Sequence, residues 1–231
     1  MQKNGLERFS TLIKLYVLHK IIDLRKQISE WKSEGLSVGL VPTMGGLHNG
    51  HGSLIKLASK KCDRVIVSIF INPTQFGDDE DFETYPQTQK SDITLISEAG
   101  GDAAFIPNVS EMYPRGFSTK VSVIGLTNML CGASRPGHFD GVTQVVAKLL
   151  NQVSADMAFF GEKDWQQLTI IKRLVRDLDI PTKIVNVATV RDEFGLALSS
   201  RNSYLKSSQL EIARKLSSVL QMTAYNIASG G

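Results

Sequence analysis

A glycine-rich segment with two histidines, residues 42–54, follows the first buried apolar run of the sequence. Its glycines let the backbone approach a ligand closely, and a helix that begins there offers free N–H groups to a phosphate. His48 and His51 are three residues apart, so both imidazoles can face one ligand and donate to phosphate oxygens in a transition state. A purely structural turn is a weaker alternative, because the segment stands between an expected strand and an expected helix. A zinc pair is weaker still, because no third zinc ligand has a recognisable spacing. The segment predicts a phosphate-binding turn.

Two segments combine a turn with side chains suited to a small organic ligand. In residues 72–77, an apolar run breaks at Asn-Pro, and Gln75 can donate and accept hydrogen bonds at once. That capacity suits a ligand that carries hydroxyl and carboxylate groups, although an ordinary loop glutamine has the same appearance. Residues 135–141 precede a helix, and ligand contact and a plain helix start are equally good interpretations of them.

Two later segments carry groups suited to phosphates. Lys163 stands at a helix start after the fourth apolar run, and the nearby Asp164 and Gln167 fit either helix capping or ligand binding. Residues 198–202 read Leu-Ser-Ser-Arg-Asn, and two hydroxyls with Arg201 suit a triphosphate and a leaving pyrophosphate. A polar turn before a helix is the alternative for this last segment.

The elements that position these segments alternate between short apolar runs and helical patterns. The expected strands cover residues 38–41, 65–71, 103–106, 157–160 and 184–187, and the expected helices lie near 18–34, 87–99, 142–153, 168–178 and 207–228. Nearly continuous apolar runs are typical of strands buried on both faces. The pattern therefore predicts an α/β fold, a Rossmann-like parallel sheet with helices on both faces and ligands beyond the carboxyl ends of the strands.

Composition excludes several classes of protein. The 231 residues are 42% hydrophobic and 21% charged, which is globular composition, and the longest apolar run is too short for a membrane span of about 20 residues. The net charge of +3 comes from 26 basic and 23 acidic residues, too even a balance to favour a nucleic-acid binder. Cys62 and Cys131 form no disulfide framework, and no secretory signal is present, so we expect a cytoplasmic protein. The acidic run 78–81 is interpreted as a solvated loop.

The set of motifs resembles the pantoate–β-alanine ligase (pantothenate synthetase) family of the nucleotidyltransferase superfamily. Residues 42–51 resemble its signature, and further matching segments follow in the family's order: residues 72–77, 85–86, 135–139, 161–164 and 198–202. The histidine turn alone marks only the superfamily, whereas the whole set is specific. The resemblance runs from about His19 to the end of the chain.

The resemblance implies ATP-dependent condensation of pantoate with β-alanine, through a pantoyl adenylate, with release of pyrophosphate and AMP. It implies ATP binding by Met44, Gly45, Gly46, Leu47, His48, Asn49, Gly50, His51, Gly161, Glu162, Lys163, Asp164, Val190, Leu198, Ser199, Ser200 and Arg201. It implies catalytic roles for His48, His51, Lys163 and Arg201, with His51 as an acid-like donor. Gln75 and Gln167 are expected to bind pantoate, Gln75 also β-alanine, and Asp164 a Mg²⁺ ion that accompanies ATP.

The family is usually homodimeric, so a homodimer is expected, with no nucleic acid or membrane as partner. The expected organisation is a leader over residues 1–16, a nucleotide- and pantoate-binding domain over 17–180, and the start of a C-terminal domain over 181–231 that stops short of the family's usual length. The sequence departs from the family pattern at Gly46, where the change is expected to be harmless. Departures at Thr74, Asp140 and Phe194 are expected to modify ligand affinity.

Two other functions compete with this interpretation. Another nucleotidyltransferase would join a phosphorylated substrate to a nucleotide, but only the first and last motifs support it. A non-catalytic binding module is the second alternative. Pyrophosphate release with pantoate and with a panel of phosphate esters separates the first, and ligand titration beside turnover separates the second.

Overall fold

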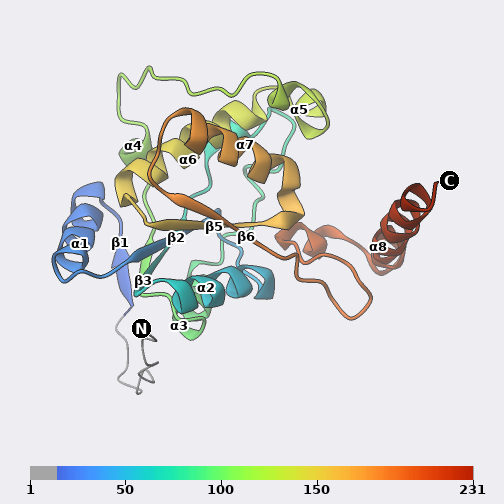
Figure 1. Ribbon diagram of the computed structural model, residues 1–231, viewed down its shortest axis with the longest axis horizontal. Helices are drawn as coiled ribbons and strands as arrows, with labels where there is room; N and C mark the ends of the chain where they lie inside the picture. Colours follow the sequence, from blue (N-terminus) through green and yellow to red (C-terminus); the bar gives the residue numbers. More distant parts are fainter. Residues whose placement is uncertain (1–14, 231) are drawn as a thin grey trace.

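The computed structural model describes residues 15–230, and within them six strands form one parallel sheet (Figure 1). The sheet order is β1-β4-β3-β2-β5-β6, and every neighbouring pair is parallel. The strands are β1 (Tyr16–Leu18), β2 (Val38–Thr43), β3 (Arg64–Ile69), β4 (Ala103–Phe105), β5 (Met157–Gly161) and β6 (Lys183–Val187). This confirms the predicted Rossmann-like α/β fold.

Helices cover both faces of this sheet. The helices are α1 (Ile21–Ser33), α2 (Asn49–Lys61), α3 (Gln89–Glu98), α4 (Val109–Met112), α5 (Cys131–Ser134), α6 (His138–Val153), α7 (Trp165–Asp177) and α8 (Ser207–Ala228). Helices α2 and α3 lie on one face, and α6 and α7 lie on the other (Figure 1). Each face therefore has its own apolar core.

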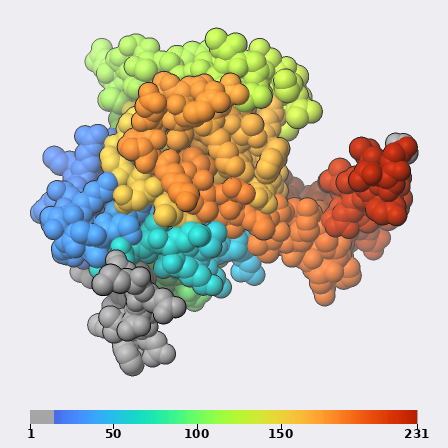
Figure 2. Space-filling model, viewed as in Figure 1, coloured from blue at the N-terminus to red at the C-terminus, as the bar shows by residue number. Residues whose placement is uncertain are grey.

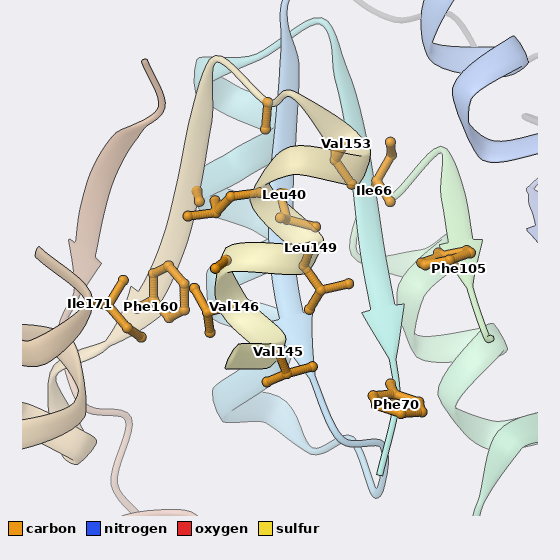
Figure 3. Close-up of a cluster of buried hydrophobic side chains, with 14 of the residues drawn as sticks. Leu40, Ile66, Phe70, Phe105, Val145, Val146, Leu149, Val153, Phe160 and Ile171 are labelled. Carbon is orange, nitrogen blue, oxygen red and sulfur yellow. The ribbon is translucent and has the colours of Figure 1, made fainter. Parts of the chain in front are cut away.

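The larger core fills the space between the sheet and helices α1, α6 and α7. Figure 3 shows Val145, Val146 and Leu149 of α6 beside Leu40 and Phe160 of the sheet. Helix α6 is buried along most of its length, so its apolar residues recur more often than on a surface helix. The second core joins the opposite face of the sheet to α2 and α3. The two cores hold the central strands rigidly, which fixes the loops at their carboxyl ends.

The chain changes direction across the sheet between β2 and β5. From β2 the chain moves through β3 to β4 on one side, and β5 and β6 then lie on the other side of β2. In parallel sheets, ligands bind outside the carboxyl ends of the strands at this kind of switch point. The predicted phosphate turn follows β2, and the predicted Lys163 segment follows β5. The topology thus brings the two segments to one place.

The structure corrects two boundaries. The helix expected over 18–34 begins at Ile21, because residues 16–18 form the edge strand β1, which the sequence analysis missed. A domain boundary at residue 180 would separate β5 from β6, yet these strands are paired from Met157–Lys183 to Gly161–Val187. The sheet therefore extends to Val187.

Helix α8 projects away from the rest of the molecule (Figure 2). It has the bounds expected from the sequence, and most of its side chains are exposed. Of the expected leader over residues 1–16, residues 1–14 lie outside the described part of the chain. Across the described residues, no helix is long and apolar enough to span a membrane.

Candidate active site

A cleft of about 250 Å³ opens at the switch point. It is lined by the loops that follow β2, β3, β5 and β6, by the N-terminal half of α2 and by one side of α6 as far as Leu149. The structure brings most predicted site residues to it: Met44, His48, Gly50, His51, Gln75, Gly161, Lys163, Asp164, Gln167, Val190, Leu198, Ser199, Ser200 and Arg201. Gly45, Gly46, Leu47, Asn49 and Glu162 do not line it.

The glycine turn is held from behind by a buried carboxylate. Gly45 and Gly46 have φ values of 91° and 62°, a left-handed backbone that favours glycine. Asp92 of α3 is only 1% exposed and accepts the backbone N–H groups of Gly46 at 3.1 Å and Leu47 at 2.8 Å. These two N–H groups are therefore already engaged by Asp92, and ATP binding by Gly46 and Leu47 stays a prediction. Their role is to shape the turn.

Asp92→Asn tests this role of the carboxylate. Asparagine can accept only one of the two N–H groups well, because its amide nitrogen is itself a donor. We expect the turn to loosen, with a loss of about 1–3 kcal/mol in unfolding free energy for the buried unsatisfied group. Chemical denaturation of the variant and the wild-type protein measures the loss, and turnover should fall with it. Unchanged stability and turnover would contradict the role.

His48 and His51 form a reciprocal cap at the start of α2. His48 Nδ1 accepts the backbone N–H of Gly50 at 3.1 Å, and His51 Nδ1 accepts the backbone N–H of His48 at 3.2 Å. An imidazole nitrogen that accepts a hydrogen bond carries no proton, so the proton of each neutral ring lies on Nε2. The two rings lie 4.2 Å apart between centroids. The arrangement provides two neutral Nε2–H donors at a helix N-terminus.

The environment keeps both rings uncharged. Burial, the neighbouring His48 and the positive charge of Lys163 lower the pKa of His51 to about 3. Burial and Lys163 also lower the pKa of His48. An imidazolium is therefore absent near neutral pH, so the donor role expected for His51 stays a prediction that its Nε2–H would have to fill. His51 can donate a hydrogen bond but has no additional proton to give.

This shift predicts a pH dependence of stability. The pKa of His51 is near 3 in the folded protein and about 6.5 in an unfolded chain. Between these values only the unfolded chain binds the proton, so the unfolding free energy falls as the pH drops below 6.5. Between pH 7 and pH 5, the wild-type protein should lose up to about 2 kcal/mol more than His51→Gln. Urea denaturation of both proteins at the two pH values measures this difference, and equal losses would contradict it.

Gln75 lies in the wall of the cleft after β3. Its side chain is buried, with Nε2 donating to Met44 Sδ at 3.0 Å and Oε1 accepting from Asn72 Nδ2 at 3.1 Å. The thioether is a weak acceptor, so the amide N–H can exchange it for a ligand oxygen. Gly141 allows α6 to approach this loop, because a Cβ there would lie 2.2 Å from the carbonyl oxygen of Thr74.

The segment after β5 contributes a charged pair to the cleft. Lys163 Nζ lies 3.7 Å from Asp164 Oδ2, and both side chains are substantially exposed. Asp164 makes no capping hydrogen bond, so the capping interpretation of its carboxylate is not supported. Glu162 instead accepts a hydrogen bond from Asn186 of β6. Lys163, Asp164 and Gln167 all face the cleft, as predicted.

The segment after β6 closes the other side of the cleft. Ser200 donates to the carbonyl oxygen of Gly46 at 2.9 Å, which joins this segment to the glycine turn. Ser199 accepts the backbone N–H of Arg201 at 3.3 Å. Arg201 is paired with Asp81 by two hydrogen bonds, from Nε at 2.8 Å and Nη2 at 2.7 Å. The acidic run 78–81 is therefore not merely a solvated loop, which corrects that interpretation.

Several residues of the cleft were missed or left undecided by the sequence analysis. Arg135 and His138 line the cleft, which favours ligand contact over a plain helix start for residues 135–141. Tyr85 lines the cleft as well. Their motifs were visible in the sequence, but nothing in the sequence marked Asp92, which lies in the first turn of α3 like an ordinary acidic residue near a helix start. Thr74, Asp140 and Phe194, where the sequence departs from the family pattern, do not line the cleft, and their effect on ligand affinity stays a prediction.

Comparison with known proteins identifies the family. The family model described as pantoate-beta-alanine ligase matches residues 16–229. The pantothenate synthetase of Dinoroseobacter shibae is 53% identical over 214 residues, which cover 93% of this chain and 76% of that protein. The pantothenate synthetase of Paramagnetospirillum magneticum is 50% identical and covers 94% of this chain and 76% of its own length.

Solved structures agree with these relatives. A pantothenate synthetase from Thermus thermophilus superposes with a TM-score of 0.89 at 45% identity, covering 94% of this chain and 77% of that chain. The pantoate-beta-alanine ligase from Francisella tularensis, described as a complex with beta-gamma ATP and beta-alanine, has a TM-score of 0.84 at 42% identity, covering 90% and 79%. The chain therefore belongs to the pantoate–β-alanine ligase family.

Proposed function

We propose that the cleft condenses pantoate with β-alanine at the expense of ATP, through a pantoyl adenylate. In the first step a pantoate carboxylate oxygen bonds to the α-phosphorus of ATP, and the bond to the leaving pyrophosphate breaks. In the second step the β-alanine amine bonds to the acyl carbon, the bond to AMP breaks, and the amine loses a proton. Membership of the family over residues 16–229, with the His48–His51 pair at the start of α2 in the cleft, is the observation that carries this proposal.

The substrates supply both nucleophiles, so the protein has to align them and stabilise charge. His48 and His51 would donate hydrogen bonds from Nε2–H to phosphate oxygens, without any proton transfer. Lys163 and Arg201 would balance the negative charge that accumulates on the phosphates. Val190 and Leu198 would line the nucleotide pocket, and Ser199 and Ser200 would donate to the phosphates. The lining positions of these residues support their roles.

Pantoate would lie between the loops after β3 and β5. Gln75 can donate to a carboxylate and accept from a hydroxyl, and Gln167 lines the same cleft. Apolar residues at the start and along one side of α6, Val142, Val145, Val146 and Leu149, provide a surface for methyl groups. β-Alanine would meet the acyl adenylate at Gln75. This combination of amide and apolar groups fits a branched hydroxy acid.

The side chains of the cleft fit a Mg²⁺ ion only when ATP phosphates supply its other ligands. Among residues 15–230, no group of three or more histidine, cysteine or acidic side chains is arranged to hold a metal. Mg²⁺ commonly uses one or two protein carboxylates plus substrate phosphates, and Asp164 supplies one carboxylate in the cleft. When bound there, the ion would neutralise phosphate charge. The homodimer and the cytoplasmic location stay predictions of the sequence.

Product analysis tests the proposed function. The chain is mixed with ATP, Mg²⁺, pantoate and β-alanine, and the products are separated by mass spectrometry. We expect pantothenate, AMP and pyrophosphate in equal amounts. Pyrophosphate release with a phosphate ester in place of pantoate would favour another nucleotidyltransferase. Binding of ATP and pantoate without turnover would favour a binding module.

A further inference from the structure

Two neighbouring carboxylates of the acidic run hold the two arginines that line the cleft. Glu80 is paired with Nε and Nη2 of Arg135, and Asp81 with Nε and Nη2 of Arg201. The two arginines come from segments far apart in sequence, the turn between α5 and α6 and the segment after β6. Each ion pair is bidentate, the geometry that fixes a guanidinium group most firmly.

The two pairs lead to different sides of the cleft. Asp81 also accepts a hydrogen bond from Tyr204 at 3.2 Å, so the carboxylate binds the segment 200–204 at two points. This segment contains Ser200, which contacts the phosphate turn at Gly46. Asp81 therefore acts on the side of the cleft where the triphosphate is proposed to lie.

Glu80 connects instead to the side of the cleft where pantoate is proposed to bind, beside Gln75. Arg135 Nη1 lies 3.1 Å from His138 Nε2, and His138 Nδ1 lies 2.7 Å from the carbonyl oxygen of Gln75. Because a guanidinium can only donate, His138 accepts at Nε2 and donates from Nδ1. A chain of hydrogen bonds thus runs from Glu80 through Arg135 and His138 to the backbone of Gln75. Burial and the charge of Arg135 lower the pKa of His138, in agreement with a neutral ring.

We propose that Glu80 and Asp81 are positioning residues for the two substrates, Asp81 for the triphosphate through Arg201 and Glu80 for the carboxylic acid through Gln75. The inference rests on the proposed function, because it assumes that Arg201 contacts phosphate and Gln75 contacts the acid. In each arginine the Nε–Nη2 edge is occupied by its carboxylate. The side chain is then ordered before the substrate arrives, which lowers the entropic cost of binding.

The sign of the effect separates positioning from a general effect of charge. Removing a carboxylate near the phosphates makes the cleft more positive, which by itself favours tighter ATP binding. Loss of positioning has the opposite effect, because a mobile arginine has to be ordered by the ligand. Asp79 belongs to the same acidic run and is exposed, so Asp79→Asn is a charge-matched control.

The experiment measures KM for ATP and pantoate, kcat and melting temperature in Asp81→Asn, Glu80→Gln and Asp79→Asn. We expect Asp81→Asn to raise KM for ATP about tenfold, with KM for pantoate little changed. Glu80→Gln should show the reverse pattern, a KM for pantoate raised about tenfold and a KM for ATP little changed. Asp79→Asn should match the wild-type protein. In an Arg201→Gln background, Asp81→Asn should add no further increase in KM for ATP, because the two residues act as one unit.

Three results would overturn the proposal. The first is tighter or unchanged ATP binding in Asp81→Asn, and the second is equal effects of both substitutions on both substrates. The third is a lower melting temperature with unchanged KM values, which would show that the ion pairs are only structural. Failure of the proposed function is seen separately, because the wild-type protein would then form no pantothenate.

Discussion

His51→Ala is expected to slow adenylate formation by roughly 100-fold to 1,000-fold while ATP affinity changes little. The Nε2–H of His51 lies at the start of α2 and is proposed to donate where negative charge develops. Removing one such donor typically costs about 3–4 kcal/mol of transition-state stabilisation. Single-turnover measurement of pyrophosphate release with saturating ATP and pantoate gives the rate, and titration with ATP gives the affinity.

Two further variants sharpen this prediction. His51→Gln places an amide N–H near the position of Nε2–H but cannot titrate, so it should retain more activity than His51→Ala. His19→Ala removes an exposed histidine whose Nδ1 lies 2.8 Å from the carbonyl oxygen of Ile106, far along the chain from the cleft residues. It should behave like the wild-type protein. Near-normal adenylate formation in His51→Ala would contradict the assigned role.

Gln75→Ala is expected to weaken pantoate binding by about 10-fold to 100-fold, the effect of losing a hydrogen bond to a charged group. The side chain is buried in the wall of the cleft, and its amide is bonded to the Met44 thioether and to Asn72. The β-alanine step should slow as well, while ATP affinity stays nearly constant. Steady-state kinetics with each substrate varied in turn measure these effects.

A second glutamine provides the control for Gln75. Gln166 bonds to the backbone of Leu126, Met129 and Cys131 and does not line the cleft. Gln166→Ala should leave the KM for pantoate unchanged even where it lowers stability. If Gln75→Ala reduced ATP affinity as much as pantoate affinity, the assignment of Gln75 to the pantoate-binding part of the cleft would be wrong.

The fold was largely predictable because each central strand of the sheet is a nearly continuous apolar run in the sequence. The strands β2, β3, β4 and β5 are short apolar runs, and the predicted Gly-rich turn follows the first of them. The edge strand β1 was missed, since its three residues are partly exposed and it exists only by pairing with β4. The pairing of β6 with β5 likewise depends on tertiary structure and overrode the boundary expected near residue 180.

The site was predictable where one segment carries the chemistry, as in the turn with His48 and His51. It was not predictable where distant segments meet. Asp92 bonds to N–H groups 45 and 46 residues earlier in the chain, and Asp81 bonds to Arg201 from 120 residues away. The neutral state of His51 was also hidden, because burial is the largest cause of its lowered pKa. Sequence spacing contains no information on any of these contacts.

Transfer of an oxygen isotope tests the central claim, that the pantoate carboxylate attacks the α-phosphorus of ATP. The protein is given pantoate labelled with ¹⁸O in its carboxylate, together with ATP, Mg²⁺ and β-alanine, and the AMP is examined by mass spectrometry. An adenylate retains one labelled oxygen on its phosphorus, so we expect one ¹⁸O in each AMP formed with pantothenate. AMP without the label, or label in the pyrophosphate, would contradict the account.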